Sequence, residues 1–142
     1  MTRCSTDAPP PAPSTRPVPV PEPAIDRLLA RARAGLARVG PDDLDAALAG
    51  GALVVDIRPE AFRREEGELP GAVVVERIHL EWRLDPTSPD RIPEAVEGRP
   101  VVIVCNEGYS SSLAAAVLRD LGVDATDLDG GYRAWRSSHD GG

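Results

Sequence analysis

Cys105 is the residue in this sequence whose neighbours point most clearly to chemistry. An unbroken apolar run, Val101 to Val104, precedes it, and Gly108 and a group of serines follow it. A thiol at the end of a buried strand is usually inert, because free cysteine packs as a small hydrophobic group. Here the glycine and the serines predict a loop and then the start of a helix, and that setting favours a reactive thiol.

The predicted loop has the properties of an anion-binding cradle. Gly108 permits a backbone conformation that other residues avoid, so that successive amide groups can turn toward one point. Those amides and the helix N-terminus would stabilise a thiolate at Cys105 and hold an anionic substrate. We therefore predict that Cys105 is a catalytic nucleophile with a substrate-binding loop formed by Asn106, Glu107, Gly108, Tyr109, Ser110 and Ser111.

Short apolar runs predict the strands that carry this loop. Three of them are rich in β-branched residues, are bounded by glycine or proline, and cover residues 52–56, 72–75 and 101–104, and a weaker fourth strand is expected at 125–128. Helical patterns alternate with them at 24–36, from about Pro41, and at 60–66, 111–121 and 132–137. The alternation predicts an α/β fold with a doubly wound parallel sheet of about five strands and helices on both faces. Ligands of such sheets bind beyond the carboxyl ends of the strands, where Cys105 lies.

The chain has room for one compact domain, which we place at residues 24–138. Residues 1–23 alternate proline with small residues, which predicts a disordered tail, with a ligand for proline-recognition domains as the alternative. We also expect a disordered C-terminus over residues 139–142. Cys4, in the tail, is expected to be a surface cysteine rather than a resolving partner of Cys105.

Charge and composition exclude several classes of partner. A formal net charge of -7 argues against nucleic acid and anionic membranes, because both require a clustered basic face. No apolar run is long enough to span a membrane, and no apolar leader follows Arg3. The chain has two cysteines, which fits a reducing compartment better than a secreted disulfide scaffold. We expect a cytoplasmic protein.

Neither a metal nor an organic cofactor is predicted. The two histidines, His79 and His139, lie far from both cysteines, and no group has the ligand spacing of a zinc site. A catalytic pair of His79 with Cys105 is the alternative, but His79 is more simply a loop residue. Trp135 is expected to pack in the core rather than to stack on a cofactor.

Several motifs together resemble those of the rhodanese family. The loop of that family starts with cysteine and has glycine three positions later, as Cys105 and Gly108 do. The other matching motifs, in the order and spacing of the family, are Val-Asp-Ile-Arg at 55–58, Gly-Glu-Leu-Pro-Gly-Ala at 67–72 and Asp-Gly-Gly-Tyr-Arg-Ala-Trp at 129–135. The resemblance implies that Asp56 and Arg58 organise loops near the site, with a smaller electrostatic contribution from Arg58.

The resemblance also implies thiosulfate sulfurtransferase activity through a persulfide on Cys105. A sulfane sulfur would pass from thiosulfate or a related donor to Cys105, and then to a thiol, cyanide or an acceptor protein. Backbone amides and the hydroxyls of Ser110 and Ser111 would hold the persulfide. Two departures from the family are a loop without arginine and Glu68 in place of a frequent histidine. Thiosulfate would be a poor donor unless Glu107 faces solvent or pairs with Arg58 or Arg133.

Two other functions fit the same fold. A rhodanese-like module that binds or regulates a partner with little turnover is favoured by the acidic loop. A related group of phosphatases uses a slightly longer loop with an arginine that clamps phosphate. The loop after Cys105 lacks that arginine, so we do not expect a phosphatase.

Overall fold

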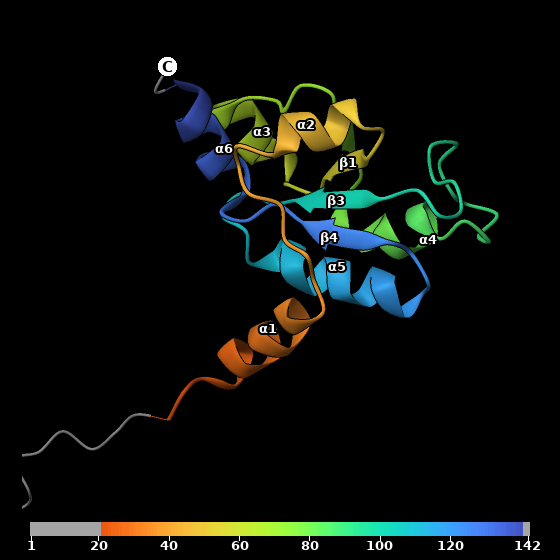
Figure 1. Cartoon of the computed structure of the whole chain (residues 1–142), viewed down its shortest axis with the longest axis horizontal. Helices are drawn as coiled ribbons and strands as arrows, with labels where there is room; N and C mark the ends of the chain where they lie inside the picture. Colours follow the sequence, from red (N-terminus) through yellow and green to blue (C-terminus); the bar gives the residue numbers. More distant parts are fainter. Residues whose placement is uncertain (1–20, 141–142) are drawn as a thin grey trace, which may run out of the picture.

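The computed structural model describes residues 21–140, so Cys4 and most of the predicted tail lie outside the described residues. A parallel sheet with the order β2-β1-β3-β4 forms the centre (Figure 1). Its strands are β1 Leu53–Asp56, β2 Val73–Val74, β3 Val101–Val104 and β4 Ala125–Asp127. All three pairings between neighbouring strands are parallel, which confirms the predicted α/β class.

The sheet has four strands, so the expected number of about five is wrong. The segment before β1 adds only a single parallel bridge, between Val39 and Leu128. There the N–H of Val39 donates to the Asp127 carbonyl at 3.0 Å, and its carbonyl accepts from Asp129 N at 2.8 Å. The ladder stops at once because Pro41, two residues later, has no N–H to donate.

Helices cover both faces of the sheet, as predicted (Figure 1). They are α1 Ala24–Ala34, α2 Leu44–Ala49, α3 Glu60–Glu66, α4 Leu80–Leu84, α5 Ser110–Asp120 and α6 Gly131–Asp140, and a 3-10 turn, η1 Arg77–His79, precedes α4. In Figure 1, α2, α3 and α6 lie on one side of the strands, α4 and α5 on the other, and α1 outside α5.

The two central strands, β1 and β3, contribute to two separate cores, because successive side chains of a strand face opposite sides of the sheet. Val55 and Ile103 pack toward α5 with Leu118. Val54 and Val102 belong to the second core, which includes Leu44, Val104 and Tyr132. Burial on both faces is the reason for the unbroken apolar runs in the sequence.

Three parts of the chain differ from expectation. The 3-10 turn and α4 were not predicted. Helix α1 forms, but none of its residues is buried, and Ile25 and Leu28 on its apolar side are 56% and 43% exposed. The C-terminal residues through Asp140 continue α6, where His139 contacts Asp45 at 2.7 Å and stacks on Trp135. No helix among residues 21–140 has the length and apolar content needed to cross a bilayer.

Candidate active site

Cys105 lies directly after β3, between the ends of β1 and β4, and only 6% of its surface is exposed. Two backbone N–H groups donate to its sulfur, from Gly108 at 3.1 Å and from Ser111 at 3.3 Å. Ser111 is in the first turn of α5, whose N-terminus carries a partial positive charge. Both amides and the helix therefore stabilise negative charge on the sulfur.

Glycines set the close packing around this loop. Gly108 has a φ of +88°, and a Cβ there would lie 2.8 Å from the nitrogen of Gly130. Gly131 has a φ of +67°, and a Cβ there would lie 2.6 Å from the carbonyl oxygen of Cys105. That oxygen accepts from Tyr132 N at 2.8 Å. The start of α6 thus lies against the loop, and a side chain at either glycine would push the two apart.

The outer side of the loop is held by two arginines from the start of the chain. Nη2 of Arg33 donates to the Gly108 carbonyl at 2.7 Å, and Nη2 of Arg38 donates to the same oxygen at 3.0 Å. Nε of Arg33 also donates to Ser112 Oγ at 3.0 Å, and its guanidinium lies 5.5 Å from the centroid of the Tyr109 ring. These contacts join residues that are 70 or more positions apart.

Asp127, the last residue of β4, anchors the start of α5. Its buried carboxylate accepts from Arg38 Nε at 2.9 Å and from Arg38 Nη2 at 3.1 Å. The hydroxyls of Ser111 and Ser112 each donate to its Oδ2 at 2.7 Å. The Ser111 hydroxyl, predicted to assist a persulfide, is therefore bound to Asp127, and Ser111 meets the sulfur through its backbone N–H instead.

The charge of Arg38 is supported by the groups around it. Burial alone would lower its pKa, but hydrogen bonding and charge attraction from Asp127 raise the pKa above the ordinary value. The negative charge of Asp129, and a negative charge on Cys105 whenever its thiol is ionised, act in the same direction. Arg38 is therefore a fixed cation close enough to Cys105 to interact with charge on its sulfur.

A hollow of about 240 Å³ opens beside the thiol and is lined by Cys105, Asn106, Glu107, Tyr109 and Ser110. At its rim Arg133 pairs with Glu66 at 2.9 Å and with Glu107 at 3.3 Å. Asn106 also donates to Glu66, at 2.9 Å. Hydrogen bonds from Arg133 and Asn106 lower the pKa of Glu66, and burial opposes them. Glu107 thus pairs with Arg133, one of the arrangements expected to reduce its repulsion of an anion.

Asp56 and Arg58 form a buried ion pair with an Nη2–Oδ2 distance of 2.8 Å. Arg58 Nη2 also donates to the carbonyl of Gly67 at 2.8 Å, and its guanidinium lies 3.8 Å from the centroid of the Tyr132 ring. The pair therefore ties β1 to the turn after α3 and to α6. These contacts give Asp56 and Arg58 a structural position. The Gly108 carbonyl of the Cys105 loop accepts hydrogen bonds from Arg33 and Arg38 instead.

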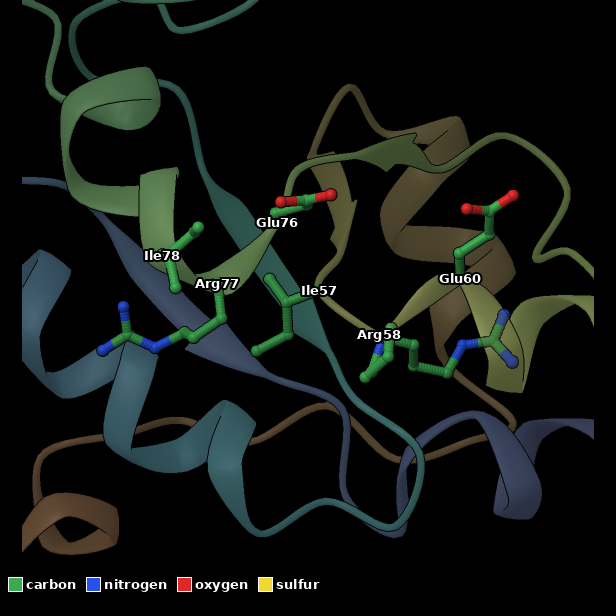
Figure 2. Close-up of a pocket in the computed structure, with 7 residues that line it drawn as sticks. Ile57, Arg58, Glu60, Glu76, Arg77 and Ile78 are labelled. Atoms are coloured by element: carbon green, nitrogen blue, oxygen red, sulfur yellow. The ribbon is translucent and has the colours of Figure 1, made fainter.

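A second hollow, of about 340 Å³, lies beyond the ends of β1 and β2 and is lined by Ile57, Arg58, Pro59, Glu60, Glu76, Arg77 and Ile78. Figure 2 shows the guanidinium of Arg58 turned away from Ile57, Glu76 and Arg77. Arg77 is paired with Glu81 at 2.8 Å. The carboxylates of Glu60 and Glu76 make this hollow less suited to a small anion than the one at Cys105.

Sequence reasoning missed Arg33, Arg38, Asp127 and Glu66. The only local signal was the position of Asp127 at the carboxyl end of a predicted strand, which is where ligand sites of parallel sheets gather. His79 lies exposed in η1, and no hydrogen bond joins it to Cys105 within the described part of the chain. Trp135 is half-buried and stacks between Tyr132 and His139, at centroid distances of 5.8 Å and 4.2 Å.

Comparison with known proteins matches the same part of the chain. A family model for the rhodanese-like domain matches residues 40–138. Thiosulfate sulfurtransferase GlpE of Pseudomonas syringae pv. syringae is 36% identical over 104 residues, which are 72% of this chain and 89% of that protein. The protein of the same name from Pseudomonas entomophila is 37% identical over 106 residues, 73% of this chain and 88% of its own length.

Two solved structures extend the comparison. A Rhodopseudomonas palustris protein of unknown function, described as a possible tyrosine phosphatase, superposes with a TM-score of 0.75 at 29% identity and covers 87% of this chain and 96% of its own. Human single-domain sulfurtransferase TSTD1 superposes with a TM-score of 0.55 at 27% identity and covers 72% of this chain and 97% of its own. The chain belongs to the rhodanese-like domain family.

Proposed function

We propose that this protein is a sulfurtransferase that carries a sulfane sulfur as a persulfide on Cys105. The observation that supports it most directly is the pair of amides, Gly108 N and Ser111 N, aimed at the sulfur at 3.1 and 3.3 Å beside an open hollow. The family and its relatives named thiosulfate sulfurtransferase support a transferase of this kind.

The reaction has two transfers with one covalent intermediate. In the first, the Cys105 thiolate attacks the outer sulfur of thiosulfate, the sulfur–sulfur bond of the donor breaks, and sulfite leaves with the bonding electron pair. In the second, a nucleophile attacks the outer sulfur of the persulfide, and Cys105 leaves as a thiolate. Cyanide then becomes thiocyanate, or a thiolate becomes a persulfide, and no oxidant is consumed. Such a sequence predicts ping-pong kinetics.

The residues around the hollow favour a small anionic donor. The amides of Gly108 and Ser111 donate to Cys105 Sγ. We propose that they also stabilise the outer sulfur of the persulfide, which carries the negative charge after transfer. Glu107 opposes an incoming anion, but Arg133 at 3.3 Å offsets that charge. We propose a thiol or an acceptor protein as the partner that removes the sulfur in the cell, with no resident cofactor.

Intact-protein mass spectrometry tests the proposal. Reduced protein is incubated with thiosulfate, desalted and weighed beside Cys105→Ser and Cys4→Ser. The expected result is an added mass of one sulfur atom on the parent and on Cys4→Ser, but not on Cys105→Ser, and its loss after addition of cyanide. No adduct with thiosulfate or with other sulfane donors would overturn the proposal and favour the partner-binding module.

The description of the R. palustris neighbour makes phosphatase activity the second outcome to test. Phosphate transfer at a cysteine loop needs a bidentate cation on the phosphoryl oxygens. None of the five residues that line the hollow at Cys105 is an arginine, and Arg33 and Arg38 donate to the Gly108 carbonyl. We expect no hydrolysis of an aryl phosphate, and turnover that depends on Cys105 would replace the proposal with a phosphatase.

A further inference from the structure

The loop after Cys105 contains no cation, yet two cations contact it from another part of the chain. Arg33 is in α1, and Arg38 is in the segment that connects α1 to α2. Both precede residue 40, where the match to the family model begins. The segment from α1 to Val39 therefore adds contacts to the loop that the matched domain does not contain.

Both arginines act on the one residue of the loop that is freest to rotate. Glycine has the widest range of backbone conformations, so the orientation of the Gly108 N–H and C=O is fixed only if neighbouring groups hold them. Its N–H donates to Cys105 Sγ on the inner side, and its carbonyl accepts from Arg33 and Arg38 on the outer side. A rotation that turned the N–H away from the sulfur would also disturb these two charged hydrogen bonds.

Arg33 forms no salt bridge within residues 21–140, and its link to the Asp127 carboxylate runs through Ser112 Oγ. Its hydrogen bonds go to the Gly108 carbonyl and to Ser112 Oγ. Its guanidinium also lies 5.5 Å from the ring of Tyr109, which lines the hollow at Cys105. Arg38, in contrast, is paired with Asp127 at 2.9 Å and Asp129 at 3.0 Å.

We propose that Arg33 and Arg38 are positioning residues for the chemistry of Cys105. From the segment upstream of the family domain they hold the Gly108 carbonyl outward and so keep its N–H on the sulfur, and Arg33 supplies the positive charge that the loop itself lacks. The effect on turnover rests on the proposed sulfur transfer, whereas the effect on thiol reactivity does not.

Alkylation of Cys105 by iodoacetamide tests this without any sulfur donor. The parent is Cys4→Ser, so that only Cys105 reacts, and Arg33→Met and Arg33→Lys are made in that background. Arg31→Met is the matched control, because Arg31 is an exposed arginine on the same helix. The rate is followed by mass spectrometry as a function of pH, and kcat and KM are measured with thiosulfate and cyanide.

We expect Arg33→Met to slow alkylation about threefold to tenfold near neutral pH and to move the midpoint of the pH profile upward, because the thiolate loses support. Its kcat should fall by more than its KM rises. Arg33→Lys should retain part of the rate, since an ammonium group can reach the carbonyl but lacks the planar fork that also holds Ser112. Arg31→Met should match the parent.

Arg38 needs a paired variant, because Arg38→Met alone leaves the buried Asp127 carboxylate unpaired and threatens folding. Arg38→Met/Asp127→Asn removes both charges, and we expect the same upward movement of the pH profile. Identical profiles for the parent, Arg33→Met and the paired variant would overturn the inference, even if a sulfur adduct forms. A displaced profile without any sulfur adduct would support it and contradict the proposed function alone.

Discussion

Asp56 and Asp127 end the two strands that flank β3, but they face opposite sides of the sheet and hold different parts of the molecule. Each is the last residue of a strand that neighbours β3, each is fully buried, and each accepts hydrogen bonds from an arginine side chain. The partner of Asp56 is two residues away in the sequence, whereas the partner of Asp127 is 89 residues away.

The difference lies in what each ion pair also holds. Arg58 donates to the carbonyl of Gly67 and lies against Tyr132, so the Asp56–Arg58 pair connects β1 to the turn after α3 and to α6. Arg38 donates to the carbonyl of Gly108, so the β4 pair joins the sheet to the Cys105 loop. Two ion pairs, each with a buried aspartate, therefore separate two tasks: the first mainly supports the fold, and the second mainly supports the reactive loop.

Removing the cation of the β1 pair should give the largest effect on stability. Arg58→Met leaves Asp56 buried without a partner, so we expect the free energy of unfolding to fall by about 3 to 5 kcal/mol. Urea denaturation followed by circular dichroism measures it. Protein that remains folded should alkylate at Cys105 within about twofold of the parent rate, since the Gly108 contacts are intact.

Arg64→Met is the control for this variant. Arg64 pairs with Glu60 at 3.0 Å, but both side chains are largely exposed, at 76% and 66%. Loss of such a pair should cost about 0 to 0.5 kcal/mol. An equal loss in both variants would contradict the role given to Asp56 and Arg58, and a strong loss of Cys105 reactivity in Arg58→Met would break the division between the two pairs.

A smaller effect, on the KM for thiosulfate, is expected at the rim of the hollow beside Cys105, where Glu107 and Arg133 form an exposed pair. Glu107→Gln removes a negative charge from the hollow, while Glu66 still holds Arg133 at 2.9 Å. We expect the KM for thiosulfate to fall by about twofold at low ionic strength and the change to vanish in high salt. Glu97→Gln, at an exposed position outside that hollow, should leave KM unchanged. A rise in KM would show that Glu107 assists the donor instead of repelling it.

The smallest effect on stability is expected for the exposed pair of Asp45 and His139, whose members lie 94 residues apart in the sequence. Hydrogen bonding to Asp45 raises the pKa of His139, and the contact from His139 lowers the pKa of Asp45. The contribution of His139 is therefore complete below its pKa in the unfolded chain and disappears as pH rises through its higher pKa in the folded chain. Asp45 loses its contribution at the acid end, as pH falls through its lowered pKa.

Melting temperatures of the parent and His139→Gln test this behaviour. The difference between them should be larger near about pH 5.5 than near about pH 8.5, on either side of the ordinary histidine range. Asp45→Asn should weaken that dependence but not remove it, because the Trp135 carbonyl and the charge of Asp42 also raise the pKa of His139. A difference that grows with pH would mean that neutral His139 is the form that stabilises the fold.

The sequence predicted the parts of the fold that rest on local patterns. The β-branched run of β3, the thiol after it and Gly108 lie within eight positions and identify the loop. The pair Asp56 and Arg58 was also found, through the Val-Asp-Ile-Arg motif that resembles the rhodanese family. The short α4 escaped because five residues are too few to show a helical period.

The contacts made by Arg33 and Arg38 were beyond local patterns. In the sequence, Arg33 is one of several arginines in the predicted helix at 24–36, and nothing near it distinguishes it from a solvent-facing arginine. Its partners, Gly108 and Ser112, are 75 and 79 residues away, and only the packing of α1 on α5 brings them together. Charge pairs of this kind leave no spacing signal, because their geometry is set by the tertiary structure.

The single bridge between Val39 and Leu128 also has a consequence for how copies of the protein meet. An edge strand with a long row of free N–H and C=O groups is a template on which another chain can pair and aggregate. Val39 covers part of the β4 edge, and Pro41 prevents a longer ladder there. At the opposite edge β2 has two residues. Both edges are thus too short to nucleate intermolecular sheet growth while the fold is intact.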